Sequence, residues 1–333
     1  MAKDNSVAGL DRMLVLEVAR VTEAAALAAA RLCGRGNEKA ADKAAVDAMR
    51  HELSRVSLRG TVVIGEGEMD EAPMLYIGEQ VGNGTGPEVD IAVDPLEGTT
   101  ICAKKMPNAL AVLAISERGG LLHAPDMYMN KIAIGPGYPE GIVDLDAPVA
   151  ENLNALAKAK GVPVSGITAC LLDRPRHAEI IRAVREAGAG VQLIPDGDIA
   201  GVIWTTDPDE TGIDIYLGSG GAPEGVLAAA ALRCIGGQIQ GRLVPSNDEE
   251  VARARKMGIT DIKKKFKLED MASSDVIFAA TGVTSGSLLE GVKFRGEMAE
   301  TETLIMRSKT GTVRRIKSRF RDAGQHLLAD HRD

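Results

Sequence analysis

The chain has 333 residues, of which 45% are hydrophobic and 26% are charged, as is typical of a globular protein with a substantial core. Its formal net charge of −8 at pH 7 argues against binding nucleic acid through a basic surface. No apolar run reaches about 18 residues without a charge, so we expect no membrane partner, and residues 2–6 are too polar for a secretory signal. The four cysteines fit neither a disulfide framework nor a zinc motif, which favours a reducing, cytoplasmic location.

The first two predicted elements are helices, and the second carries a candidate functional acid. Residues 10–32 are alanine-rich with helical periodicity, and the run stops at Gly34-Arg35-Gly36, a pattern typical of a helix C-terminus. Asn37 then predicts the cap of a helix over residues 38–54. Asp42 lies about one turn into this helix, so its side chain can face a site near the helix start.

An acidic loop follows the first predicted strand, residues 61–64. Gly65 and Gly67 flank Glu66, which indicates a carboxylate held on a tightly turned backbone, and we favour a functional role for Glu66. The remaining acids of the loop are equally well explained as solvated surface residues: Glu68, Asp70 and Glu71.

Residues 89–100 are the most informative segment. A buried strand ends in two carboxylates three positions apart, Asp94 and Glu97, and we expect Pro95 to end its pairing. Gly98 permits a tight turn, and hydroxyl groups follow at Thr99 and Thr100. A turn with solvated acids would explain the pattern taken alone. Because a second acidic loop also follows a strand, and because neighbouring carboxylates repel each other, we favour a site for a cation.

The rest of the chain predicts further strands and a boundary between two lobes. Strands are expected at 109–116, around 121 and at 127–134, and the linker-like residues 135–139 and 144–148 suggest two lobes, 1–150 and 151–320, with a tail at 321–333. From 167 onward strands and helices alternate, which indicates a mixed or parallel sheet covered by helices. The predicted strands are 167–172, 191–194, 213–217, 276–280, 303–307 and 312–316, and the predicted helices are 177–187, one from 199, and 224–235.

Three of these strands are followed by polar turns. The segment Gly218 to Glu224 opens a helix whose free amides favour an anion, although it is neither a Rossmann nor a P-loop fingerprint, and Glu224 adds an acid. Arg174 and Arg176 could hold a phosphate, and the acids of the Pro195-Asp196-Gly197-Asp198 turn could accept hydrogen bonds from hydroxyl groups. Each turn alone is more often plain surface, but successive strand ends of one sheet converge at one edge.

This set of residues favours metal-assisted phosphoryl transfer. Ligands that are only carboxylates point to Mg²⁺ or Mn²⁺ rather than to zinc. Such ions neutralise phosphate oxygens and lower the pKa of water. Thr99 could orient the attacking water, with Asp42 or Glu66 accepting its proton.

With these residues assembled, the chain resembles the class II fructose-1,6-bisphosphatases, a branch of the lithium-sensitive, metal-dependent sugar and inositol phosphatases. The superfamily signature is an acidic Gly-Glu loop plus Asp-Pro-x-Asp/Glu-Gly-Thr, found here at Gly65-Glu66 and residues 94–99. The resemblance extends over about residues 16–316. Further segments match the class II branch in particular: 63–68, 71–76, 124–129, 174–177, 195–198 and 220–225.

The resemblance implies an α/β (α+β) two-lobed, layered sugar-phosphatase fold in which helices sandwich mixed sheets. It implies Mg²⁺- or Mn²⁺-dependent hydrolysis of the 1-phosphate of fructose 1,6-bisphosphate, a gluconeogenic reaction, by a homo-oligomer. The implied metal ligands are Asp42, Glu66, Asp94, Glu97 and Glu224, with the carbonyl of Leu96 as a further candidate. The implied substrate contacts are Glu97, Gly98, Thr99, Tyr128, Arg174, Pro175, Arg176, Asp196, Gly197, Asp198 and Gly221.

Roles follow from the same resemblance. Thr99 would position the attacking water, the 1-phosphate would lie on the metals, and the arginine turn would hold the distal phosphate. Asn37 stands where relatives often carry Asp, which suits a helix cap and leaves the ligands untouched. Two alternatives stay open: a bisphosphatase that also accepts sedoheptulose 1,7-bisphosphate, and an inactive regulator that binds sugar phosphates.

Overall fold

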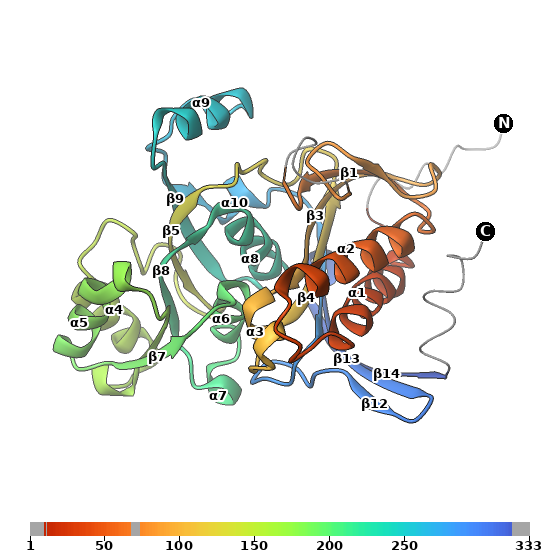
Figure 1. Ribbon diagram of the computed structural model, residues 1–333. Helices are drawn as coiled ribbons and strands as arrows, with labels where there is room; N and C mark the ends of the chain where they lie inside the picture. The colour runs from red at the N-terminus through yellow and green to blue at the C-terminus, as the bar shows by residue number, and fades with distance from the viewer. Residues whose placement is uncertain (1–9, 11, 68–73, 322–333) are drawn as a thin grey trace.

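The computed structural model describes residues 10, 12–67 and 74–321. This part of the chain forms two mixed β-sheets and ten α-helices, which stack in the order helix, sheet, helix, sheet, helix (Figure 1). The predicted α/β (α+β) class, with mixed sheets sandwiched by helices, is thereby confirmed. The loop acids Glu68, Asp70 and Glu71 lie outside the described residues.

The first sheet has the strand order β12-β13-β11-β4-β3-β1-β2, and β14 also pairs with β13. β1 and β3 run parallel, and the other pairs are antiparallel. Its strands are β1 (Arg59–Ile64), β2 (Gln80–Val81), β3 (Glu88–Glu97), β4 (Leu110–Glu117), β11 (Val276–Gly282), β12 (Lys293–Arg295), β13 (Met298–Arg307) and β14 (Thr312–Arg321).

The second sheet has the order β10-β9-β5-β8-β6-β7, with β6 parallel to both β7 and β8. The predicted parallel strands at the polar turns are therefore confirmed, and they end at the same edge of the sheet. Its strands are β5 (Tyr128–Ile134), β6 (Thr168–Leu172), β7 (Gly190–Ile194), β8 (Ile215–Gly221), β9 (Gln238–Val244) and β10 (Phe266–Lys267).

Both faces of the first sheet are buried at its inner strands, β1, β3, β4 and β11. Helices α1 (Leu14–Ala30) and α2 (Glu38–Leu53) cover one face, and the central helices cover the other. Successive strand residues point to opposite faces, so β3 sends Ile91 toward α1 and α2 and sends Ala92 into the central core. Burial on both faces explains why the strands read as continuous apolar runs.

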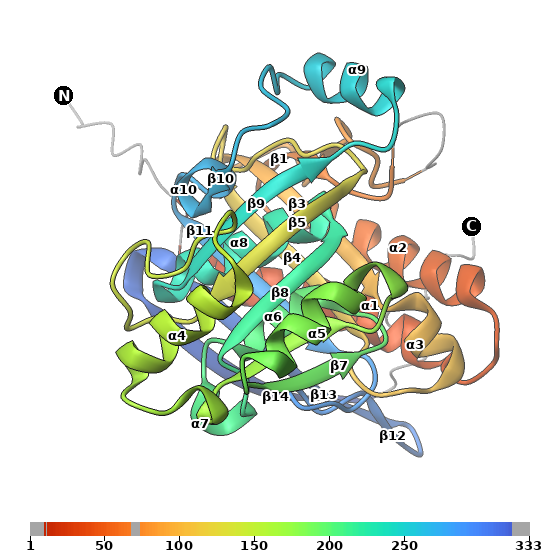
Figure 2. The same cartoon turned by 90° about the vertical axis from the view of Figure 1, so that its left-hand side faces the viewer.

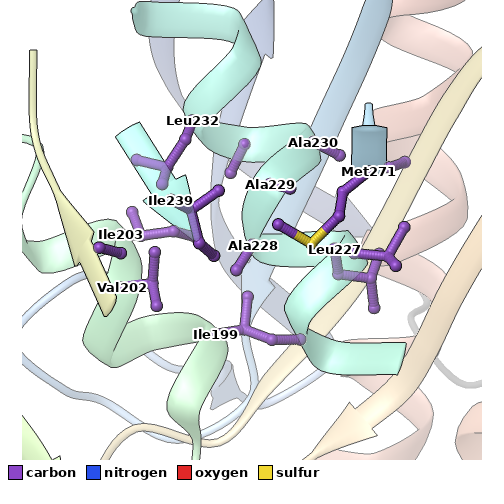
Figure 3. Close-up of a cluster of buried hydrophobic side chains, with 14 of the residues drawn as sticks. Ile199, Val202, Ile203, Leu227, Ala228, Ala229, Ala230, Leu232, Ile239 and Met271 are labelled. Carbon is purple, nitrogen blue, oxygen red and sulfur yellow. The ribbon is translucent and has the colours of Figure 1, made fainter. Parts of the chain in front are cut away.

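The central layer is built mainly from α6 (Asp198–Trp204) and α8 (Ala222–Ile235), with α10 (Leu268–Met271) packed on α8. Figure 3 shows Ile199, Val202 and Ile203 of α6 facing the small side chains of α8. The alanines at 228–231 of α8 are all buried, because this helix is enclosed by sheets and helices rather than facing water.

The outer face of the second sheet is covered by α4 (Val149–Lys160) and α5 (Ala178–Glu186), and α5 lies in front of β8 in Figure 2. Two short helices, α7 (Pro208–Thr211) and α9 (Asp248–Lys256), lie at the periphery, and α3 (Thr99–Lys104) follows β3. None of the helices in residues 10, 12–67 and 74–321 is long and apolar enough to cross a membrane.

The two sheets are not consecutive in the chain. β5 precedes residue 150 but belongs to the second sheet, whereas β11 to β14 follow that position and return to the first. The division into lobes 1–150 and 151–320 with a tail at 321–333 stays a prediction. Each of the two sheets contains strands from both sides of residue 150.

Some predicted element boundaries were wrong. Pro95 does not end strand pairing: β3 extends to Glu97 through a register shift, and such a bulge accommodates a residue without an N–H. The glycines at 218–221 belong to β8, where their backbone pairs with β5. The predicted strand around 121 is only an isolated bridge.

Candidate active site

A cavity of about 440 Å³ is lined by residues of β1 and β3 of the first sheet, of helices α2, α3 and α8, and of the loops that precede β5 and follow β7 of the second sheet. None of its lining residues, within the described ranges, is a lysine, an arginine or a histidine. The cavity is therefore strongly negative, and it suits cations rather than free anions. Seven of its lining residues are acidic: Asp42, Glu66, Asp94, Glu97, Asp126, Asp196 and Glu224.

The β3–α3 turn supplies two acids and a hydroxyl group. Within the bulge, Asp94 Oδ1 accepts a hydrogen bond from the amide of Leu96 at 3.1 Å. Gly98 adopts the left-handed conformation with φ 84°, which turns the chain so that α3 begins at Thr99 on the cavity wall. The sequence prediction of a tight turn at Gly98 is confirmed.

Glu97 also connects β3 of the first sheet with α6, the helix that follows β7 of the second sheet. Its Oε1 accepts a hydrogen bond from the amide of Ile199, the second residue of α6, at 3.1 Å. The α6 helix begins after Gly197, which has φ 86°. The turn after β7 is thereby held against the turn after β3, and both face one cavity.

Glu66 and Asp42 approach from the first sheet and from α2. The amide of Glu66 donates to the carbonyl of Leu75 at 3.0 Å, and a Cβ on Gly65 would lie 2.0 Å from that carbonyl oxygen. Only glycine fits this close backbone approach, so Gly65 is what allows the loop to present Glu66. Asn37 caps α2 by accepting from Ala40 at 3.0 Å, which sets the helix start and places Asp42 on the cavity wall.

Glu224 enters from the N-terminus of α8. A Cβ on Gly221 would lie 1.8 Å from Glu224 Oε2, so this glycine leaves room for the carboxylate. Glu224 Oε2 is buried and has no hydrogen-bond partner among the described residues. A buried carboxylate oxygen without a partner, facing a negative cavity, is suited to a cation.

The acids raise each other's pKa. Burial, followed by repulsion from Asp94 and Asp42, raises the pKa of Glu66 to about 8. Burial raises the pKa of Asp94 to about 6 and, with repulsion from Asp198, that of Glu224 to about 7. Burial and then Asp94 raise the pKa of Glu97 well above its usual range, and burial raises those of Asp42 and Asp196.

These residues fit a divalent cation by their chemistry. No three His, Cys, Asp or Glu side chains of the described residues form a ready-made metal site. The acids instead converge from separate elements, and Asp94 and Glu97 share a hydrogen bond that requires a proton on one of them. A divalent cation would take the place of such protons, because it neutralises the same repulsion with oxygen ligands.

The second sheet contributes polar residues beside the cavity. Asp196 lines it and pairs with Arg174 at 3.8 Å, whereas Asp198 is buried and pairs with Lys131. The Arg176 guanidinium stacks 4.7 Å from the ring centre of Tyr128 and donates to the carbonyl of Ser219 at 2.7 Å. Among the predicted substrate contacts, these lie outside the cavity lining: Tyr128, Arg174, Pro175, Arg176, Gly197, Asp198 and Gly221.

Sequence reasoning assigned no role to three residues of this region. Asp126 lines the cavity just before β5, within a segment used only for the family resemblance. Lys131 is 1% exposed and donates to Asp198 and, at 2.8 Å, to the carbonyl of Gly221. A lysine directly before the apolar run Ile132-Ala133-Ile134 of the same strand was the available signal.

The third residue is His177, which is also 1% exposed. Its Nδ1 donates to the carbonyl of Leu172 at 2.7 Å, and its Nε2 accepts from the amide of Ser219 at 2.8 Å. This imidazole therefore fixes the arginine turn against β8. Burial lowers its pKa, which keeps the neutral form that this pair of hydrogen bonds requires.

Comparison with known proteins shows the family. The sequence matches the family described as "Bacterial fructose-1,6-bisphosphatase, glpX-encoded" over residues 12–320. It is 50% identical over 321 residues to "Fructose-1,6-bisphosphatase 1 class 2" of Escherichia coli (strain K12), covering 92% of this chain and 95% of that protein. "Fructose-1,6-bisphosphatase class 2" of Shigella flexneri shows the same identity and coverage. The chain therefore belongs to the class II fructose-1,6-bisphosphatase family, as the sequence motifs predicted.

Proposed function

We propose that this protein hydrolyses the 1-phosphate of fructose 1,6-bisphosphate, giving fructose 6-phosphate and inorganic phosphate. The convergence of seven acids on one cavity, in a member of this family, is the observation that supports the proposal. A bisphosphate carries several negative charges and would be repelled by that cavity alone. The substrate therefore requires cations bound between the acids and the phosphate.

The cation we propose is Mg²⁺ or Mn²⁺, because the available side-chain ligands are all oxygen atoms. The residues proposed to hold it are Asp42, Glu66, Asp94, Glu97 and Glu224, with the carbonyl of Leu96 as a further candidate. When bound, such an ion neutralises phosphate oxygens and lowers the pKa of water.

The side chains then have distinct roles. The Thr99 hydroxyl orients the attacking water, because Thr99 begins α3 at the cavity wall beside Glu97 and Gly98. Asp42 or Glu66 accepts the proton of that water.

The second sheet binds the sugar and the distal phosphate in this proposal. Asp196, Gly197, Asp198 and Gly221 contact the sugar, and the exposed ledge formed by Tyr128 and the turn at 174–176 holds the phosphate. Arginine suits this role because its planar guanidinium can donate two hydrogen bonds to one phosphate. The homo-oligomeric assembly is carried over from the resemblance described above, and the cytoplasmic location from the cysteine pattern.

Neighbouring threonines provide a matched test. We expect Thr99→Ala to lower kcat for phosphate release from fructose 1,6-bisphosphate by about 100-fold, within the range for losing a group that assists proton transfer. Thr100→Ala is the control, because Thr100 is the next residue of the same helix and does not line the cavity. Equal activity of both variants with Mg²⁺ and with Mn²⁺ would contradict the role of Thr99.

The substrate range is tested in the same assay. Phosphate release from sedoheptulose 1,7-bisphosphate, fructose 1-phosphate and an inositol phosphate should give lower kcat/KM than fructose 1,6-bisphosphate. Binding of fructose 1,6-bisphosphate by calorimetry without phosphate release, with either metal, would instead indicate a regulator that binds the sugar.

A further inference from the structure

Two cysteines that are 69 positions apart in sequence touch behind the catalytic turn. The Sγ atoms of Cys33 and Cys102 lie 3.1 Å apart, and each is a free thiol. Cys33 follows the last turn of α1 and is half-buried, whereas Cys102 is fully buried in α3. The spacing in sequence gave no sign of this pair.

We propose that Cys33 and Cys102 form a reversible disulfide that lowers the activity of the neighbouring site. Bond formation requires the sulfurs to close from 3.1 Å to about 2.05 Å, a movement of about 1 Å. Cys33 and Cys102 are the two cysteines that touch among the described residues, whereas Cys170 and Cys234 are buried free thiols, and Cys234 donates to the carbonyl of Ala230.

Cys33 is the reactive member of the pair. The hydrogen bond from the Cys102 thiol, opposed by burial and assisted by the nearby Lys105, lowers the pKa of Cys33. The same shared hydrogen bond, with burial, raises the pKa of Cys102. Cys33 is therefore the more acidic of the two thiols and the one that an oxidant in solution can reach, and Cys102 is the resolving thiol behind it.

The chemistry balances with a small disulfide such as oxidised glutathione as the oxidant. The Cys33 thiolate attacks one sulfur of the oxidant, which breaks the oxidant's S–S bond and releases one thiolate. Cys102 then attacks Cys33 Sγ, releasing the second small thiol, which carries away the proton of Cys102. Two protein thiols are oxidised to one disulfide, and one small disulfide is reduced to two thiols.

The catalytic turn is connected directly to this pair. The amide of Cys102 donates to the carbonyl of Gly98 at 2.9 Å in the first turn of α3, whose first residue is Thr99. The amide of Gly34 donates to the carbonyl of Cys102 at 3.0 Å, so the segment joining α1 to α2 is also held on α3. A shift of about 1 Å in this turn is large enough to misplace a catalytic group and cost about 100-fold in rate.

The test uses the full-length protein, equilibrated in buffers of increasing ratio of oxidised to reduced glutathione. Peptide mass mapping should find a Cys33–Cys102 cross-link in the unchanged protein and in Cys234→Ser, but not in Cys33→Ser or Cys102→Ala. Phosphate release should fall by tenfold or more as the cross-link forms, and dithiothreitol should restore it. Neither cysteine variant should lose activity on oxidation.

The effect of the disulfide on activity rests on the proposed function. The experiment nevertheless distinguishes a failure of the disulfide proposal from a failure of the proposed phosphatase function. A stable glutathione adduct on Cys33 without a cross-link in the unchanged protein would overturn the disulfide. A cross-link with unchanged turnover would overturn its effect on activity. Absence of phosphatase activity in the fully reduced protein would count against the proposed function alone, because the cross-link is measured by mass.

Discussion

The two turns that meet at the cavity have nearly the same backbone but opposite electrostatic surroundings. After β3 and after β7 the chain passes through a left-handed glycine, Gly98 or Gly197, and begins a helix at once. The acids at the end of β3, Asp94 and Glu97, face other acids, whereas each acid after β7 has a cation: Arg174 for Asp196 and Lys131 for Asp198. The first turn therefore needs a cation from solution, and the second is neutralised by the protein itself.

The largest effect is expected at the turn without a cation. Glu97→Gln removes a proposed metal ligand while keeping the size of the side chain, and we expect kcat/KM for fructose 1,6-bisphosphate to fall at least about 100-fold. Glu88→Gln is the matched control, because Glu88 begins the same strand and is exposed beside Arg59. If phosphate release by Glu97→Gln equals that of the control, this turn does not hold the metal.

The neutralised turn should instead respond in stability and in substrate binding. Lys131→Met leaves Asp198 buried without a partner, so we expect the free energy of unfolding to fall by about 3–5 kcal/mol in denaturant titration. KM should rise more than kcat falls, because Lys131 also holds the carbonyl of Gly221.

Two further variants test this interpretation. Adding Asp198→Asn to Lys131→Met should recover stability without restoring KM. Lys160→Met breaks a more exposed Lys–Asp pair, with Asp214, at a distance from the cavity lining. It should lower stability but leave KM unchanged, and a KM shift of equal size would show that Lys131 has only a structural role.

The contrast between the turns also explains what could be predicted from the sequence. The acids at the end of β3 were found because Asp94 and Glu97 lie within five positions of Thr99, so that local spacing alone shows the chemistry. Most helices and strands were predicted for the same reason, since their apolar periodicity is local.

Features that depend on contacts distant in sequence were not predicted. Lys131 meets Asp198 only because β5 lies beside β8 and α6 packs on β8. Cys33 meets Cys102 only because the α1–α2 connection packs on α3. The bulge at Pro95 was missed because it depends on pairing with β4. No spacing in the sequence encodes these contacts.

A smaller effect, in pH dependence, should distinguish metal-free from metal-bound protein. The pKa of Glu66 is raised to about 8 and that of Glu224 to about 7, from 4.5 for both. Between pH 4.5 and pH 8 the two carboxyl groups therefore bind more protons in the folded state than in the unfolded state. The unfolding free energy of the metal-free protein should fall as the pH rises from about 4.5 to about 8.

Thermal unfolding at pH 5 and pH 8 tests this sign. Mn²⁺ should raise the melting temperature more at pH 8, because it binds the deprotonated carboxylates. Glu224→Gln should flatten the pH dependence of the metal-free protein, since it removes one of the titrating groups. A metal-free protein that becomes more stable between pH 5 and pH 8 would contradict the assignment.

The smallest effect is expected at the hydroxyl of Tyr216, a polar group of the second sheet. The hydroxyl of Tyr216, on β8, is fully buried without a hydrogen-bond partner among the described residues, and burial raises its pKa well above the usual range. Tyr216→Phe keeps the ring and removes only this hydroxyl, so the unfolding free energy should stay unchanged or rise by up to about 1 kcal/mol. The control is Thr281→Val, where a buried hydroxyl bonded to Thr22 and Thr303 is lost and stability should fall by about 1 kcal/mol. If Tyr216→Phe is the less stable of the two variants, or raises KM, the hydroxyl forms a hydrogen bond in solution. The polar groups beside the turn after β7 would then include more than the two ion pairs.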